Sequence, residues 1–160
     1  MIAAALLLLL QTAAAPGETR SFGDWMAGCD NALVCEAQSL PWTADGGGEL
    51  IAYQLVVTRA AAPDATPHIH LLNQEEEGPY RLPVLVDGRE VAVATRGESE
   101  DSYVFTEDAG AALLAAIVTG ETAQVQSREG LPPVTLSLAG SSAALRWIDE
   151  RQRRAGTVTA

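Results

Sequence analysis

The chain has 160 residues, a length that suits one domain. With 48% hydrophobic and 19% charged residues, its composition is not that of a disordered protein, and it is long enough to bury a substantial core. Its 21 acidic residues outnumber 10 arginines, lysine is absent from the sequence, and the net charge is −11. A surface this acidic repels phosphate backbones, so we expect no nucleic-acid partner.

The N-terminus carries an apolar run from Ile2 to Leu10, followed by the small residues Thr12-Ala13-Ala14. This run is too short to span a bilayer, which needs about 20 residues. A short apolar region before small residues is typical of a secretory signal peptide. We therefore expect residues 1–14 to be a signal peptide. Residues 15–160 are expected to form a single β-rich domain that is exported to the periplasm and keeps no membrane span after cleavage.

The two cysteines, Cys29 and Cys35, have C-x5-C spacing rather than the C-x-x-C of redox enzymes. Trp25 and Ala27 before Cys29, and Ala37 after Cys35, follow the period of two that is typical of strands. This pattern predicts a hairpin that places both sulfurs on its inner face, where they form a disulfide suited to an oxidising compartment. Free thiols or a metal site are the alternatives, although a zinc site needs four ligands.

Further strands are predicted by the same alternation over residues 50–58, 68–72, 102–106 and 133–138. Residues 82–93 predict a hairpin, because Asp87-Gly88 suits a type I′ turn in which both central residues have positive φ. A two-residue turn sets Val84 opposite Val91. Pro83 lacks an amide donor, so its strand is expected at a sheet edge or at a bulge.

A first helix is expected from about Glu107 to Thr119, with Thr106 as its N-cap and Gly120 as its stop. Its buried stripe would consist of Leu113, Leu114, Ile117 and Val118.

A second helix is expected from the N-capping run Gly140-Ser141-Ser142 to about Arg154, with Asp149–Arg153 and Glu150–Arg154 as i,i+4 ion pairs. Together these elements predict a mainly β fold of the α+β class. We expect an antiparallel β-sandwich or open barrel with two packed helices.

Two stretches resemble an uncharacterised family of secreted bacterial proteins, known as domain of unknown function 1176. The first is F-G-D-W-M-A-G-C-D-N from Phe22 to Asn31 with Cys35-Glu36-Ala37 after it, and the second is S-L-A-G-S-S-A-A-L-R-W-I-D-E-R-Q from Ser137 to Gln152. The order of elements is also distantly similar to the invasion-associated locus B family. The resemblance implies export to the periplasm or cell envelope, and it brings neither a reaction nor a catalytic residue. Family members usually continue beyond the R-A-G-T-V-T-A ending, so we expect a truncated or short member.

A candidate metal site is formed by His68 and His70, which lie on one face of a predicted strand, with the acidic run Glu75–Glu77 nearby. The alternative is a solvent-exposed face, because Ile69 and Leu71 take the inward side. A Ser-His-Asp set from Ser141 or Ser142, His70 and Asp149 lacks a G-x-S-x-G elbow.

Candidate contact residues lie in two further places. Trp42 precedes a glycine run and would mark an exposed contact surface, with partial burial as the alternative. Arg146 and Arg151 belong to a basic patch on the second helix, whose alternative is a solvated helix face. Trp147 and Arg151 have the i,i+4 spacing that allows stacking.

The function that we expect is that of a non-enzymatic module of the cell envelope that binds a protein partner, with no cofactor and no catalytic residue. One alternative is a periplasmic inhibitor that inserts the acidic segment Glu75–Glu77 into the cleft of a hydrolase. The other alternative is a small metal-dependent hydrolase built on His68 and His70.

Overall fold

The computed structural model describes residues 17–40, 53–73, 78–99, 101–126 and 133–154. The expected signal peptide, Trp42 and the acidic run Glu75–Glu77 lie outside the described residues. In chain order the elements are β1 (Thr19–Phe22), β2 (Trp25–Cys29), β3 (Cys35–Ser39), β4 (Tyr53–Arg59), β5 (His68–Asn73), β6 (Arg81–Val86), β7 (Arg89–Arg96), β8 (Ser102–Val104), α1 (Glu107–Thr119), β9 (Thr122–Val125), β10 (Val134–Ser137) and α2 (Ser141–Arg151).

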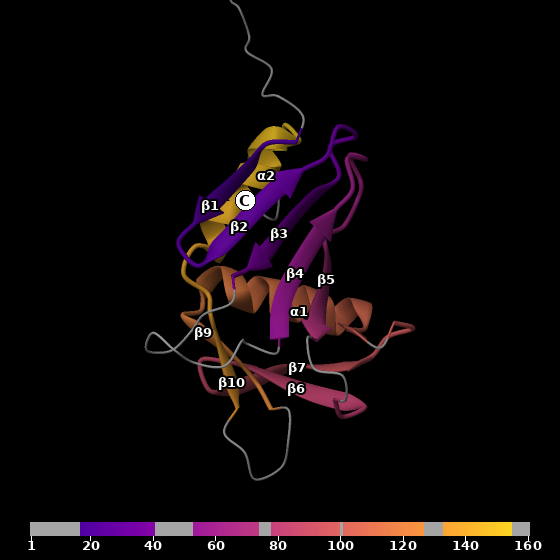
Figure 1. Ribbon diagram of the computed structural model, residues 1–160, viewed down its shortest axis with the longest axis vertical. Coiled ribbons are helices and arrows are strands. Elements are labelled where there is room, and N and C mark those ends of the chain that lie inside the picture. Colours follow the sequence, from indigo (N-terminus) through magenta and orange to yellow (C-terminus); the bar gives the residue numbers. More distant parts are fainter. Residues whose placement is uncertain (1–16, 41–52, 74–77, 100, 127–132, 155–160) are drawn as a thin grey trace, which may run out of the picture.

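Within the described residues, ten strands form one antiparallel sheet in the order β1-β2-β3-β4-β5-β8-β7-β6-β9-β10. The sheet curls without closing, with α1 crossing between the half formed by β1–β5 and the half that contains β6, β7, β9 and β10 (Figure 1). In the same view α2 lies behind β1 and β2. The mainly β fold with two packed helices is thus confirmed.

The hairpin of β2 and β3 has the predicted register, with Cys29 opposite Cys35 and a disulfide between them. Both cysteines are buried, as are Trp25, Ala27 and Ala37 on the same face. The predicted disulfide is therefore confirmed. The connecting loop is held by the carboxylate of Asp30, which accepts hydrogen bonds from the amides of Ala32 and Val34.

The hairpin of β6 and β7 has the predicted turn, since Asp87 and Gly88 have φ of 49° and 79°. The predicted register is wrong by one residue: Val84 lies opposite Ala92, because the register shifts between Val84 and Leu85. The buried partners on β7 are consequently Ala92 and Ala94 instead of the valines.

Two strands were not predicted. β1 is polar and largely exposed, so its sequence has no alternation of apolar residues. The short strand β9 pairs with both β6 and β10, which places β6 inside the sheet. Pro83 is therefore next to a bulge, as expected, but not on an edge strand; the β6–β9 ladder covers Val84 to Val86 and ends before the proline.

Helix α1 has the predicted bounds, and the Thr106 side chain accepts a hydrogen bond from the Ala109 amide as its N-cap. Leu113 and Ile117 are buried, whereas Leu114 and Val118 are half-buried. Within the described residues no helix has the length and apolar character needed to cross a membrane.

Helix α2 corrects two predictions. Gly140 is the N-cap and no side chain caps the helix, because Ser141 is buried and its hydroxyl donates to the Ile117 carbonyl of α1 at 2.6 Å. Asp149 is also buried and pairs with Arg59 of β4, while Arg153 is exposed. Tertiary contacts between helices and strands thus decide the partners of Ser141 and Asp149.

Candidate functional site

The two stretches that carry the family resemblance contact each other. The turn between β1 and β2 packs against the segment between β10 and α2, where the Trp25 indole donates to the Ser137 carbonyl at 3.0 Å. The Asp24 amide donates to the Ala139 carbonyl at 2.8 Å, and the Ser137 hydroxyl donates to the Asp24 carboxylate at 2.6 Å. Asp24, Trp25 and Ser137 therefore join the turn after β1 to the segment before α2.

Two glycines permit this contact. A Cβ atom on Gly23 would lie 2.7 Å from the Ala139 carbonyl oxygen, and one on Gly140 would lie 1.7 Å from the Phe22 carbonyl oxygen. Both glycines also have positive φ, which other residues adopt at a cost. At both positions a larger residue would overlap the facing backbone, which explains why the two motifs contain glycine there.

A buried polar network lies under the disulfide loop. Cys35 pairs directly with Arg59, whose guanidinium donates to the Asp149 carboxylate. Gln152 donates from its Nε2 to the Leu33 carbonyl at 2.8 Å and to the Arg59 carbonyl at 3.1 Å. Through Gln152, the C-terminal end of α2 is hydrogen-bonded to the loop that the disulfide closes.

The predicted site histidines lie on the outward side of β5. His68 is exposed and His70 is half-buried, with His70 opposite Val56. Burial lowers the pKa of His70. The charge of Glu36 acts in the opposite direction, and His68 lowers this pKa further. No group of three metal-ligating side chains lies close together in the described parts of the chain, while the candidate ligands Glu75–Glu77 lie outside them.

The predicted Ser-His-Asp set is not assembled. Ser141 is buried against α1 and Asp149 is buried against Arg59, while His70 is on the outward side of the sheet.

The predicted basic patch is partly engaged in packing. The guanidinium carbon of Arg151 lies 5.1 Å from the Trp147 ring centroid, which confirms the expected stacking, and Arg151 also pairs with Glu18 at 3.2 Å. Phe22 is 6.1 Å from Trp147, between ring centroids. Arg146 is exposed and donates to the Ser142 hydroxyl at 3.0 Å. Arg151 therefore helps to hold the start of β1 on α2, whereas Arg146 and Arg153 face solvent.

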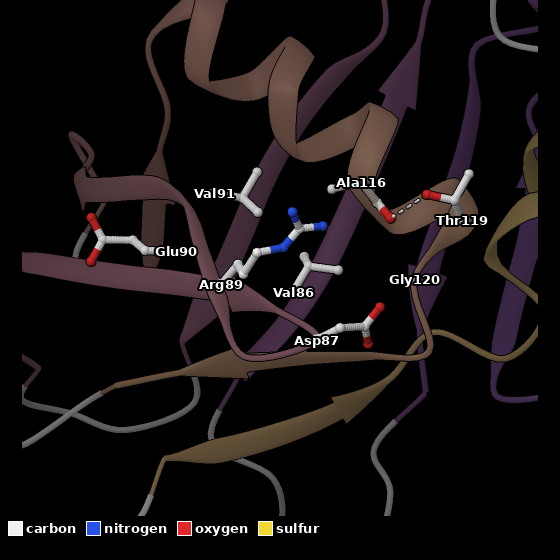
Figure 2. A pocket seen from close by; sticks show the side chains of 8 residues that line it. All are labelled: Val86, Asp87, Arg89, Glu90, Val91, Ala116, Thr119 and Gly120. Atoms are coloured by element: carbon white, nitrogen blue, oxygen red, sulfur yellow. Dashed lines mark hydrogen bonds between the residues drawn. The ribbon is translucent and has the colours of Figure 1, made fainter.

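A hollow of about 330 Å³ lies between the Asp87-Gly88 turn and the end of α1. Figure 2 shows the Arg89 guanidinium pointing into it between Val86 and Val91, toward the last turn of α1. That turn contains no basic residue of its own, so Arg89 supplies a positive charge near the negative end of the helix dipole. The Asp87 carboxylate accepts from the amides of Glu121 and Thr122, and these bonds lower the pKa of Asp87. The side chains of Asp87 and Arg89 around this hollow therefore connect the β6–β7 hairpin to the end of α1.

The outward side of β1–β5 and β8 carries two rows of neighbouring side chains, which we call the outer face. One row is Thr19, Gly28, Glu36, Thr58 and His68, and the other is Ser21, Met26, Gln38, Val56, His70 and Val104. Apart from Val56, the members of both rows are half-buried or exposed. Both helices pack on the opposite side, where Leu114 of α1 and Leu145 of α2 lie beside Val57 of β4. The outer face is therefore covered by neither helix.

A groove of about 470 Å³ lies on the outer face over β1–β4. Gly28 lies at its centre, between Thr19 and Glu36 in the first row, and Met26 and Val34 are part of its lining. Sequence reasoning missed this groove. The one available signal is the glycine inside the W-M-A-G-C strand, since a strand glycine marks a bulge or a place that another group approaches closely.

Comparison with known proteins places the chain in a family. The family described as a protein of unknown function, DUF1176, matches residues 19–160. The uncharacterized protein YpfG of Escherichia coli (strain K12) is 31% identical over 152 residues, which cover 92% of this chain. The chain spans 42% of the length of that relative.

The crystal structure of invasion associated protein B from Bartonella henselae superposes with a TM-score of 0.60. The match covers 85% of this chain and 99% of that chain, at 18% identity. At this identity the likeness establishes the shared fold alone. Both resemblances drawn from the sequence are confirmed, and the chain belongs to the DUF1176 family of proteins of unknown function.

Proposed function

We propose that this protein is a non-enzymatic module of the periplasm or cell envelope that binds a protein partner through its outer face. The observation that carries the proposal is that both helices pack on the opposite side, so that two rows of mixed polar and apolar side chains remain accessible. A sheet face of this kind can bind a protein partner, because its side chains provide hydrogen-bonding groups together with small apolar contacts.

The compartment is part of the proposal. It is supported by the short apolar run before Thr12-Ala13-Ala14 and by the buried disulfide between Cys29 and Cys35, because disulfides persist in oxidising compartments. Two polar residues of the family motifs also favour a binding role over catalysis, since Asp24 and Ser137 are engaged in packing the turn after β1 against the segment before α2.

Site-specific photo-crosslinking in cells tests this proposal. A photoreactive residue replaces Thr58 on the outer face or, as the control, Ala143 on the exposed side of α2. We expect a discrete protein adduct in the periplasmic fraction from position 58 and none from position 143. Recovery of the protein from the cytosol, equal labelling from both positions, or turnover of a glycan, ester or peptide by the purified protein would overturn it.

A further inference from the structure

We propose that the groove over Gly28 receives a lysine or arginine side chain from an extended segment of a partner protein. This inference rests on the proposed function and names the chemistry of the partner. Gly28 adds no side chain to the groove, and the Thr19 methyl group lies close over it, 2.9 Å from where a Cβ would be. Its neighbours across the strands are Thr19 and Glu36.

The charge of the groove selects a cation. Asp30 and Glu36 are the charged residues of its lining. The Asp30 carboxylate is engaged with the amides of Ala32 and Val34. Within the described parts of the chain, the exposed Glu36 carboxylate makes no hydrogen bond and no ion pair, so it is available to a cationic group. A charge-assisted hydrogen bond to such a carboxylate is among the stronger polar contacts.

The shape of the groove selects a long side chain. Met26 and Val34 provide apolar surface beside Gly28, and Val34 is 39% exposed. Lysine and arginine place an aliphatic stem along apolar surface while the charged head remains at a polar rim. The stem would therefore lie beside Met26 and Val34, with the head at Glu36.

The surroundings select a protein over a small free cation. The groove is open, its lining includes Gln38 and Thr58, and the outer face continues beyond it with Ser21. The side chains of these three residues offer hydrogen bonds to an extended backbone. A small cation in the groove would leave these groups unused. The net charge of −11 also attracts a basic partner over long range.

Titration of the ¹⁵N-labelled protein with the blocked peptide acetyl-Thr-Val-Lys-Val-Thr-amide tests this inference by NMR. We expect amide shift changes centred on Thr19, Gly28 and Glu36. The Glu36→Gln variant should bind the peptide at least threefold more weakly, because it removes the charge and keeps the shape. The matched control, Glu90→Gln, removes an exposed carboxylate that points away from the neighbouring hollow (Figure 2) and should leave the affinity unchanged.

A second variant tests the shape independently. A Cβ at position 28 would lie 2.9 Å from the Thr19 Cγ2, so Gly28→Ala is combined with Thr19→Ser, which removes that methyl group. This double variant should also weaken peptide binding at least threefold, while Thr19→Ser alone should not.

Three results would overturn the inference. Equal effects of Glu36→Gln and Glu90→Gln would mean that the acidic surface attracts the peptide without a site. Equal affinity for a peptide with glutamate in place of lysine would exclude charge recognition, and equal affinity for free spermidine would exclude a protein segment as the preferred ligand. The crosslink from position 58 can still form in each of these cases, so failure of this inference is distinguishable from failure of the proposed function.

Discussion

Gly140 passes so close to Phe22 that a Cβ atom on the glycine would lie 1.7 Å from the Phe22 carbonyl oxygen. The contact joins the end of β1 to the start of α2, two elements that are separated by more than a hundred residues in the sequence. The two motifs that characterise this chain meet at this contact, which packs the end of β1 against the start of α2.

Substitution of Gly140 by alanine should therefore destabilise the protein strongly. The variant must relieve the overlap with Phe22 and adopt a φ of 104°, which together should cost at least about 3 kcal/mol in the free energy of unfolding. Urea denaturation followed by tryptophan fluorescence measures the loss.

The control is Gly88→Ala in the β6–β7 turn, where φ is also positive at 79° but nothing lies within 4 Å of the added Cβ. This change should cost only about 1–2 kcal/mol, the price of the backbone conformation alone. Similar losses for the two variants would contradict the close contact.

Removal of the disulfide should destabilise the chain by about 2 kcal/mol, the chain-entropy value for a loop as short as that between Cys29 and Cys35. The double variant Cys29→Ala/Cys35→Ala tests this, again by urea denaturation. Treatment of the variant with a reductant should cause no further loss, whereas the same treatment should destabilise the unaltered protein. A reductant effect that persists in the variant would exclude the disulfide as its cause.

The buried ion pair between Arg59 and Asp149 should be sensitive to the loss of one partner. Asp149→Asn leaves the guanidinium in a buried site without its counter-charge, and should cost about 3–5 kcal/mol. The double variant Arg59→Met/Asp149→Leu replaces both charges by apolar groups and should recover most of that loss. A double-mutant cycle of unfolding free energies measures both effects, and a loss below about 1 kcal/mol for Asp149→Asn would contradict the pairing.

Stability should decrease as the solution is acidified through the range in which His70 titrates. Burial lowers the pKa of His70 in the folded chain below its ordinary value of 6.5, so the unfolded chain binds more protons than the folded chain as the pH falls below that value. The unfolding free energy should therefore decline from about pH 6.5 down to the folded pKa of His70, and this contribution should then level off.

Urea denaturation at several pH values, with His70→Gln as the variant, measures this component. The substitution should flatten the decline, because it removes the group whose pKa differs between the two states. His68→Gln and Glu36→Gln are the controls, since these are the charged groups that act on His70. Removal of Glu36 should lower the pKa of His70 further, and an unchanged decline in His70→Gln would contradict the assignment.

Much of the fold was predictable because the relevant signals are local. Alternation around Cys29 and Cys35 places both sulfurs on one face, and Asp87-Gly88 favours positive φ irrespective of distant contacts. The first helix followed from its cap at Thr106 for the same reason. The groove was harder to predict from the sequence. Gly28 lies inside a strand, and the sequence alone does not show which residues flank it on the neighbouring strands.

The sequence by itself thus determined the fold class, the family and the cysteine pairing, all of which depend on residues close together along the chain or on recognisable motifs. Only the tertiary structure decided the one-residue register shift in β6–β7, the insertion of β9 between β6 and β10, and the partners of Ser141 and Asp149. These features depend on residues that are far apart in sequence, and their outcome is set by which buried polar groups and apolar faces can be satisfied together.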